Sequence, residues 1–149
     1  FDQAMIDIID PLQPKLVVLA GFMRILSDLF ISHYHQRLIN IHPSLLPKYK
    51  GLNTHQQAID NHDKKHGASV HYVNHELDSG ALILQAETPV LENDDAESLA
   101  LRVLKDEHQI YPLAIKMHLD GRLTFSGEQL ILDNKPLTSA LIWDSNNDF

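Results

Sequence analysis

The segment Leu38-Ile-Asn40-Ile-His42-Pro-Ser44-Leu-Leu-Pro47 joins an apolar run to two prolines and a serine, which end that run. The apolar run predicts a β-strand, and alternation along a strand places residues two positions apart on the same face. We therefore expect Asn40 and His42 to point the same way at the carboxyl end of the strand, where open α/β sheets bind their ligands. The same spacing also fits an ordinary strand end with two polar residues at a turn.

An amide beside an imidazole suits chemistry at a carbonyl group. The Asn40 side chain can donate a hydrogen bond to an oxygen that gains negative charge, and the His42 ring can hold or transfer a proton. Ser44 lies in the same loop as His42, where the two cannot form a catalytic triad, and the glycine-flanked motif of a serine nucleophile is absent. The segment therefore shows no sign of a serine nucleophile.

Helical and strand patterns alternate on both sides of this segment. A continuous apolar run that ends in glycine is typical of a strand buried on both faces, and residues 15–21 form such a run. A helical period of apolar residues follows the two aspartates at 94 and 95. The order of elements predicts a single α/β domain. The expected elements are helices at 4–10, 27–34, 55–61 and 95–115, strands at 15–21, 38–42, 68–73 and 81–90, and a terminal hairpin at 121–135.

Composition narrows the possible functions. The chain has 149 residues, 44% of them hydrophobic, which is enough for one core. Its net charge of -8 opposes non-specific binding to nucleic acid or to an anionic membrane. It has no cysteine, so disulfides and thiolate catalysis are excluded. No apolar run is long enough to cross a membrane, nothing suggests export, and we expect a cytoplasmic location.

A second candidate for chemistry is Asp78, which stands between two predicted strands in the segment Glu76-Leu-Asp78-Ser-Gly80. A carboxylate in a turn can approach an imidazole across a cleft, where it favours the imidazolium form and can accept a proton. An aspartate before Ser-Gly also commonly bonds its own turn backbone. Spacing alone leaves both interpretations open.

The ten histidines raise the question of a metal site. His62 and His66 are four residues apart, and so are His71 and His75, which is the spacing that zinc enzymes use on a helix. Neither pair lies in a predicted helix, and no Glu follows the first His as in the zinc protease motif. We therefore predict solvated surface histidines and no metal.

Several segments together resemble the folate-dependent formyltransferase family. Asn40-Ile-His42-Pro-Ser-Leu-Leu-Pro47 with a downstream Glu-Leu-Asp78-Ser-Gly is similar to the Asn-x-His pair and the Asp of that family. The resemblance extends over residues 1–135 and is strongest to the branch that formylates glycinamide ribonucleotide. Supporting segments are 19–27, 49–52 with 54–55, 66–71 and 107–112.

This resemblance implies a fold and an activity. The fold would be the C-terminal part of a Rossmann-like formyltransferase domain over residues 1–149, with a mostly parallel sheet, helices on both faces and a terminal β hairpin. The activity would be transfer of a formyl group from 10-formyltetrahydrofolate to the amine of glycinamide ribonucleotide in purine biosynthesis. The reaction would pass through a tetrahedral intermediate without metal, and neither nucleic acid nor membrane would be a partner.

The resemblance also implies a role for individual residues. Asn40 would hydrogen-bond the formyl oxygen, His42 as imidazolium would stabilise the oxyanion, and Asp78 would favour that imidazolium and accept the proton of the amine. Glu107 would hold the ribose of the ribonucleotide, with Asn40 and Pro43 also in contact with it. The folate would lie against Met23, Arg24, Ile25 and Leu26 on one side and Val73, Asn74, His75, Glu76, Leu77 and Asp78 on the other.

The chain departs from the family pattern in three places. Lys50 stands where the family usually has Pro, and Asn53 stands where it often has His, both near the expected nucleotide site. The family begins with a strand and a phosphate-binding loop that we expect to lie upstream of Phe1. Two alternatives to the transferase follow: a hydrolase that releases formate from the same folate, and an inactive folate-binding fragment.

Overall fold

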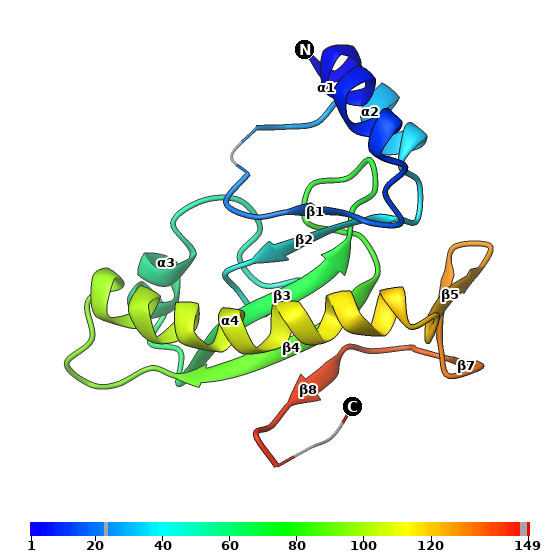
Figure 1. The fold of residues 1–149 in the computed structure, drawn as a ribbon. Helices are drawn as coiled ribbons and strands as arrows, with labels where there is room; N and C mark the ends of the chain where they lie inside the picture. Colours follow the sequence, from blue (N-terminus) through cyan, green and yellow to red (C-terminus); the bar gives the residue numbers. More distant parts are fainter. Residues whose placement is uncertain (23, 147–148) are drawn as a thin grey trace.

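The computed structural model describes residues 1–22, 24–146 and 149, and it contains a five-stranded sheet with helices on both sides (Figure 1). The strand order in this sheet is β1-β2-β3-β4-β8. The predicted α/β class is confirmed. The strands are β1 (Val17–Leu19), β2 (Leu38–His42), β3 (Lys65–Tyr72), β4 (Leu82–Pro89) and β8 (Leu141–Trp143).

The sheet is mixed in direction. β1 pairs with β2 and β4 pairs with β8 in parallel, whereas β3 is antiparallel to both of its neighbours. The chain leaves β2, passes through the short helix α3 (Thr54–Asp60) and enters β3 beside the end of β2, where His42 is paired with Ser69. The return at the same end of the sheet is what reverses β3. In the described sheet β1, β2, β4 and β8 run in one direction, so the predicted mostly parallel sheet is confirmed.

One face of the sheet is covered by the long helix α4 (Ala96–Leu119), which crosses β3 and β4 (Figure 1). The helix begins with a capping box, in which the Asp95 carboxylate accepts a hydrogen bond of 2.8 Å from the Ser98 N–H. Its buried residues recur at the spacing of a helical face and pack against Ile39 of β2 and the centres of β3 and β4. They are Leu99, Val103, Ile110, Ala114 and Met117.

The other face carries α1 (Asp2–Ile9), the short 3-10 helix η1 (Asp10–Leu12) and α2 (Asp28–His33). Ile6, Phe30 and Ile31 form a second apolar cluster there with Leu38 of β2. Leu38 and Ile39 belong to different clusters because adjacent strand residues point to opposite faces. The predicted helices on both faces are confirmed, and the alternation directs Asn40 and His42 to the face of α1 and α2.

Beyond α4 the chain forms a small antiparallel sheet of β5 (Leu123–Ser126), β6 (Gln129–Leu132) and β7 (Lys135–Pro136). Its first two strands are the predicted terminal hairpin, with Leu123 opposite Leu132. The chain then returns to the main sheet as β8. Over the described residues, no helix has both the length and the apolar character that crossing a membrane requires.

Candidate functional site

Asn40 and His42 lie at the carboxyl end of β2 and share one face of it, as alternation predicts. In the antiparallel ladder, Asn40 is directly opposite His71 of β3. Residues directly opposite one another in such a ladder place their side chains on the same face of the sheet. Three polar side chains from two central strands are therefore collected on the face that also carries α1 and α2.

The His42 ring is buried and has a defined neighbour at each nitrogen. Its Nε2 lies 2.8 Å from the carbonyl oxygen of Tyr49, and its Nδ1 lies 3.6 Å from Oδ2 of Asp78. A carbonyl oxygen only accepts, so Nε2 carries the hydrogen of that bond. Nδ1 is consequently the nitrogen that can gain or release a proton, and it faces a carboxylate.

Asp78 reaches this position from the loop between β3 and β4. Its Oδ2 accepts a hydrogen bond of 2.9 Å from the backbone N–H of Gly51, in the loop that follows β2. The side chain is only 8% exposed, and the residue has a φ of +49°, a region that Asp adopts more readily than most residues. The carboxylate therefore bonds a distant loop rather than its own turn, and the turn-aspartate interpretation is wrong.

A second contact joins the same two loops near the surface. Lys50 Nζ donates a hydrogen bond of 2.5 Å to the hydroxyl of Ser79. Lys50 is exposed, whereas the neighbouring bond from Gly51 to Asp78 is partly buried. The loop after β2 thus covers His42 and is held to the Asp78 loop by one backbone bond and one side-chain bond.

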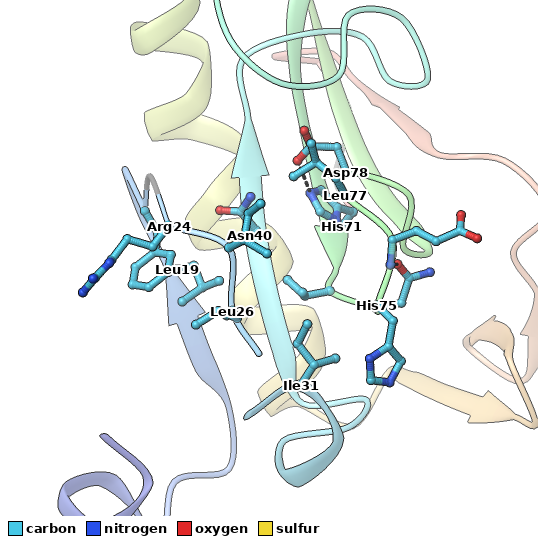
Figure 2. Close-up of a pocket in the computed structure, with 14 residues that line it drawn as sticks. Leu19, Arg24, Leu26, Ile31, Asn40, His71, His75, Leu77 and Asp78 are labelled. Atoms are coloured by element: carbon cyan, nitrogen blue, oxygen red, sulfur yellow. Dashed lines mark hydrogen bonds and ion pairs between the residues drawn. The ribbon is translucent and has the colours of Figure 1, made fainter. Parts of the chain in front are cut away.

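A pocket opens between Asp78 and the segment that follows β1 (Figure 2). Two predicted folate segments line it from opposite sides, although about fifty residues separate them in the sequence. Two apolar side chains at the pocket are exposed, Ile25 by 88% and Leu77 by 59%, and a ligand could cover them. The lining residues are Leu19, Phe22, Arg24, Ile25, Leu26, Ile31, Asn40, His71, Val73, Asn74, His75, Glu76, Leu77 and Asp78.

The predicted site residues do not all line the pocket, and one that does, Arg24, directs its charged group elsewhere. Met23 falls outside the described residues. The Arg24 guanidinium lies 4.1 Å from the centre of the Phe1 ring and extends away from the pocket (Figure 2). His42, Pro43 and Glu107 are not among the lining residues. Of the three proposed catalytic residues, Asn40 and Asp78 line the pocket. His42 lies behind Asp78 and faces its carboxylate.

Glu107 lies on α4, and burial raises the pKa of its carboxyl group. One turn further along, the Tyr111 hydroxyl donates to the carbonyl oxygens of Leu19, the last residue of β1, and Ile39, the second residue of β2. The burial of its phenol raises the pKa of Tyr111. This face of α4 therefore connects the two strands that carry the site.

The prediction of surface histidines is wrong for His66 and His71, which are 1% and 2% exposed. All residues of β3 after its first are buried, because the strand is central in the sheet and covered on both faces. His66 Nε2 lies 3.1 Å from Nδ1 of His55, and burial lowers the pKa of His66 to about 4. Among the described residues, no three His, Cys, Asp or Glu side chains are grouped so that they could hold a metal ion.

His71 is a polar residue of the pocket that the sequence analysis did not predict. Nothing in its local sequence distinguishes it from His66, since both lie in one short apolar strand. Only the register of β2 against β3, which sets His71 opposite Asn40, indicates its place. The sequence analysis also did not predict Leu19, Phe22 and Ile31 as pocket residues. Their closeness in the sequence to the predicted segment 24–26 could have indicated them.

Comparison with known proteins shows the family of this chain. The sequence profile of the formyl transferase family matches residues 1–115. Phosphoribosylglycinamide formyltransferase of Escherichia coli is 53% identical over 137 residues, which are 92% of this chain and 65% of that protein. The chain thus spans slightly less than two thirds of the length of this curated relative.

Solved structures agree with the sequence match. The phosphoribosylglycinamide formyltransferase of Coxiella burnetii superposes with a TM-score of 0.91 at 48% identity, covering 96% of this chain and 68% of that one. A formyltetrahydrofolate deformylase of Pseudomonas syringae superposes with a TM-score of 0.82 at 29% identity, covering 87% and 44% of the two chains. The match of the family profile over more than half of the sequence and the shared fold lead to one conclusion: this chain belongs to the formyl transferase family.

Proposed function

We propose that this chain carries the formyl-transfer centre of a phosphoribosylglycinamide formyltransferase. It would move a formyl group from 10-formyltetrahydrofolate to the amine of glycinamide ribonucleotide, a cytoplasmic step of purine biosynthesis. The observation that carries the proposal is the position of Asp78, whose carboxylate is 3.6 Å from His42 Nδ1 and lines the same pocket as Asn40. The two similar transferases reported above favour this reaction over others of the family.

The reduced folate would occupy the pocket between residues 24–26 and residues 73–78. Exposed Ile25 and Leu77 supply apolar surface for a flat ring, and the backbone of both segments supplies donors and acceptors. In this position the formyl group of the folate would lie beside Asn40 and Asp78, which line the same pocket. Asn40 and Asp78 are the polar side chains there that the proposed chemistry requires.

The reaction begins when the amine nitrogen attacks the formyl carbon and negative charge develops on the formyl oxygen. The Asn40 amide donates a hydrogen bond to that oxygen, which is worth most in the transition state. Asp78 accepts the proton that the nitrogen loses, and the His42 imidazolium beside it balances the carboxylate charge. The bond from carbon to N10 of the folate then breaks, and N10 takes up a proton.

The test is an assay of formyl transfer with Asn40→Ala and His42→Ala variants. Loss of the oxyanion donor Asn40 typically costs about 100- to 1,000-fold in rate. Loss of His42 removes the cation beside Asp78, so each variant is expected to lose most turnover while still folding. His108→Ala, an exposed change on α4, is the control. Near-normal transfer by His42→Ala would overturn the assignment.

The alternatives are separated by omitting one substrate. A hydrolase would release formate from 10-formyltetrahydrofolate without an amine acceptor, and the 29%-identical deformylase is the observation that keeps this candidate. A folate-binding fragment would bind the reduced folate in a titration but fail to bind the ribonucleotide. We expect both ligands to bind, no formate to be released when the amine is omitted, and formyl transfer when both substrates are present.

A further inference from the structure

His71 presents an unusual nitrogen to the pocket. Its Nδ1 lies 2.9 Å from the carbonyl oxygen of Tyr72, so Nδ1 carries the hydrogen of that bond. Its Nε2 is buried and has no hydrogen-bond partner, the only such side-chain nitrogen or oxygen in the part of the chain that the structure describes. Buried polar atoms are nearly always bonded, so this one indicates a partner of a kind that the protein does not supply.

The Asp78 carboxylate lies close to this nitrogen. Oδ1 of Asp78 is 4.0 Å from Nε2 of His71, too far for a hydrogen bond (Figure 2). Oδ2 of the same carboxylate is already bonded to Gly51 and faces His42. Burial lowers the pKa of the His71 ring more than the nearby Asp78 raises it, so the ring is neutral at pH 7 and Nε2 has a free lone pair.

Two acceptors therefore face one pocket at a distance that matches a single small donor. Hydrogen bonds of about 2.9 Å from one atom to both acceptors would enclose an angle of about 90°, which water or a primary amine spans with slightly bent bonds. A carbonyl, an ether or a tertiary amine has no hydrogens to share and does not fit. The shared chemistry is a donor atom that carries two hydrogens.

We propose that Nε2 of His71 and Oδ1 of Asp78 together hold the two hydrogens of the attacking primary amine. An inference of this kind rests on the proposed function, because that function supplies the amine. When both hydrogens are held, the nitrogen lone pair points away from the two acceptors and toward the formyl carbon. His71 would thus be a substrate-binding residue that selects primary over secondary amines, while Asp78 remains the group that accepts the proton.

The kinetic test compares two substitutions at residue 71. His71→Asn keeps a side-chain amide near the position of Nδ1 and removes the acceptor at the position of Nε2. His71→Gln places an amide oxygen near the position of Nε2. Loss of one hydrogen bond to the reacting amine is expected to lower kcat/KM about 30-fold in His71→Asn. His71→Gln is expected to retain activity within about fivefold of the wild type.

The specificity test uses glycinamide ribonucleotide methylated on its amine, which has one hydrogen fewer. The wild type is expected to prefer the primary amine, and this preference should shrink about tenfold in His71→Asn. A structural role for His71 would lower both rates together and leave the ratio unchanged. An unchanged ratio in a folded His71→Asn variant would overturn the proposal.

The nitrogen NMR spectrum of His71 tests the proposal without any turnover. At pH 7.5 we expect an unprotonated Nε2 in the free chain, and a shift of its resonance when glycinamide ribonucleotide is added. A protonated Nε2, or an unshifted Nε2 with the nucleotide bound, would overturn the role of His71 even if the wild type transfers formyl. If Nε2 shifts on addition of the nucleotide but no formyl is transferred, the proposed function alone is contradicted. If the resonance of the free chain already shows a hydrogen-bonded Nε2 and the nucleotide does not change it, the donor is a water molecule and the amine is rejected.

Discussion

The two ends of strand β3 each carry a buried histidine, and they differ in what those histidines bond. His66, near the start of the strand, shares a hydrogen bond with His55, whereas His71, at the end, leaves Nε2 without a partner and facing Asp78. Their exposed fractions are nearly equal, at 1% and 2%. Burial of a histidine therefore does not by itself indicate a functional site, whereas an unsatisfied nitrogen opposite a carboxylate in a pocket makes His71 a candidate for one.

The same contrast extends to the groups around each histidine. Near His66, Asp63 is occupied by Tyr49 and Lys48, so the donors and acceptors of that end are matched. Near His71, the Asp78 carboxylate has one backbone donor and two imidazoles at 3.6 and 4.0 Å. The first end stabilises the fold, and the second has acceptor capacity left for a ligand.

The largest effect should come from removing the carboxylate that distinguishes the second end. Asp78→Asn keeps the size of the side chain, an oxygen for the Gly51 N–H and a residue that tolerates positive φ. Without a proton acceptor, kcat for formyl transfer is expected to fall about 1,000-fold, with the melting temperature nearly unchanged. Stopped-flow or quenched-flow assays with both substrates measure this kcat.

Asp60→Asn, an exposed change at the end of α3, is the matched control for that substitution and should leave kcat within about twofold of the wild-type value. If Asp78→Asn retained most of its turnover, the acceptor capacity at this end of β3 would have no catalytic meaning. The comparison between the two ends would then reduce to a difference in packing.

Much of the fold could be predicted because its signals are local. The apolar period of α4 and the glycine-bounded hairpin at β5 and β6 are each contained in one segment of chain. β8 was not predicted, since a strand of three residues is decided by pairing with β4 rather than by its own sequence. The direction of β3 likewise follows from where α3 returns the chain, which no residue pattern encodes.

The candidate site divides in the same way. Alternation alone predicts that Asn40 and His42 share a face of β2, and the structure agrees. The position of Asp78 depends on the N–H of Gly51, twenty-seven residues earlier, so loop closure decides it. His71 was overlooked because its role depends on strand register, and a one-residue slip would turn its side chain to the other face.

Acid should affect the His66 end of the strand before it affects the carboxylates of the fold. Burial lowers the pKa of His66 to about 4, below its ordinary value of 6.5. The unfolded chain therefore binds more protons than the folded chain between these values, and stability falls as pH decreases from about 6.5 to about 4. The expected loss is about 3 kcal/mol, or roughly 6 to 12 °C in melting temperature.

His66→Gln removes the titrating ring and should flatten this part of the curve of melting temperature against pH, and His108→Gln on the exposed face of α4 should not. His55 and His71 also have pKa values lowered by burial, so a smaller slope of the same sign should remain in His66→Gln. A slope that is the same in wild type and His66→Gln would show that the matched pair does not titrate as a buried group.

The smallest effect should come from Lys50, an exposed residue of the loop that contacts the Asp78 loop. Its bond to Ser79 lies at the surface, and exposed contacts of this kind contribute little because solvent competes for both partners. The Gly51 N–H holds Asp78 through the backbone and does not depend on the Lys50 side chain. Lys50→Ala, Ser79→Ala and the double variant are therefore each expected to change kcat by less than about threefold, without measurable coupling between the two positions. A fall in kcat for Lys50→Ala as large as that of Asp78→Asn would mean that the lysine charge acts on the reacting groups, so that Asp78 and His71 alone would not account for the chemistry at this end of β3.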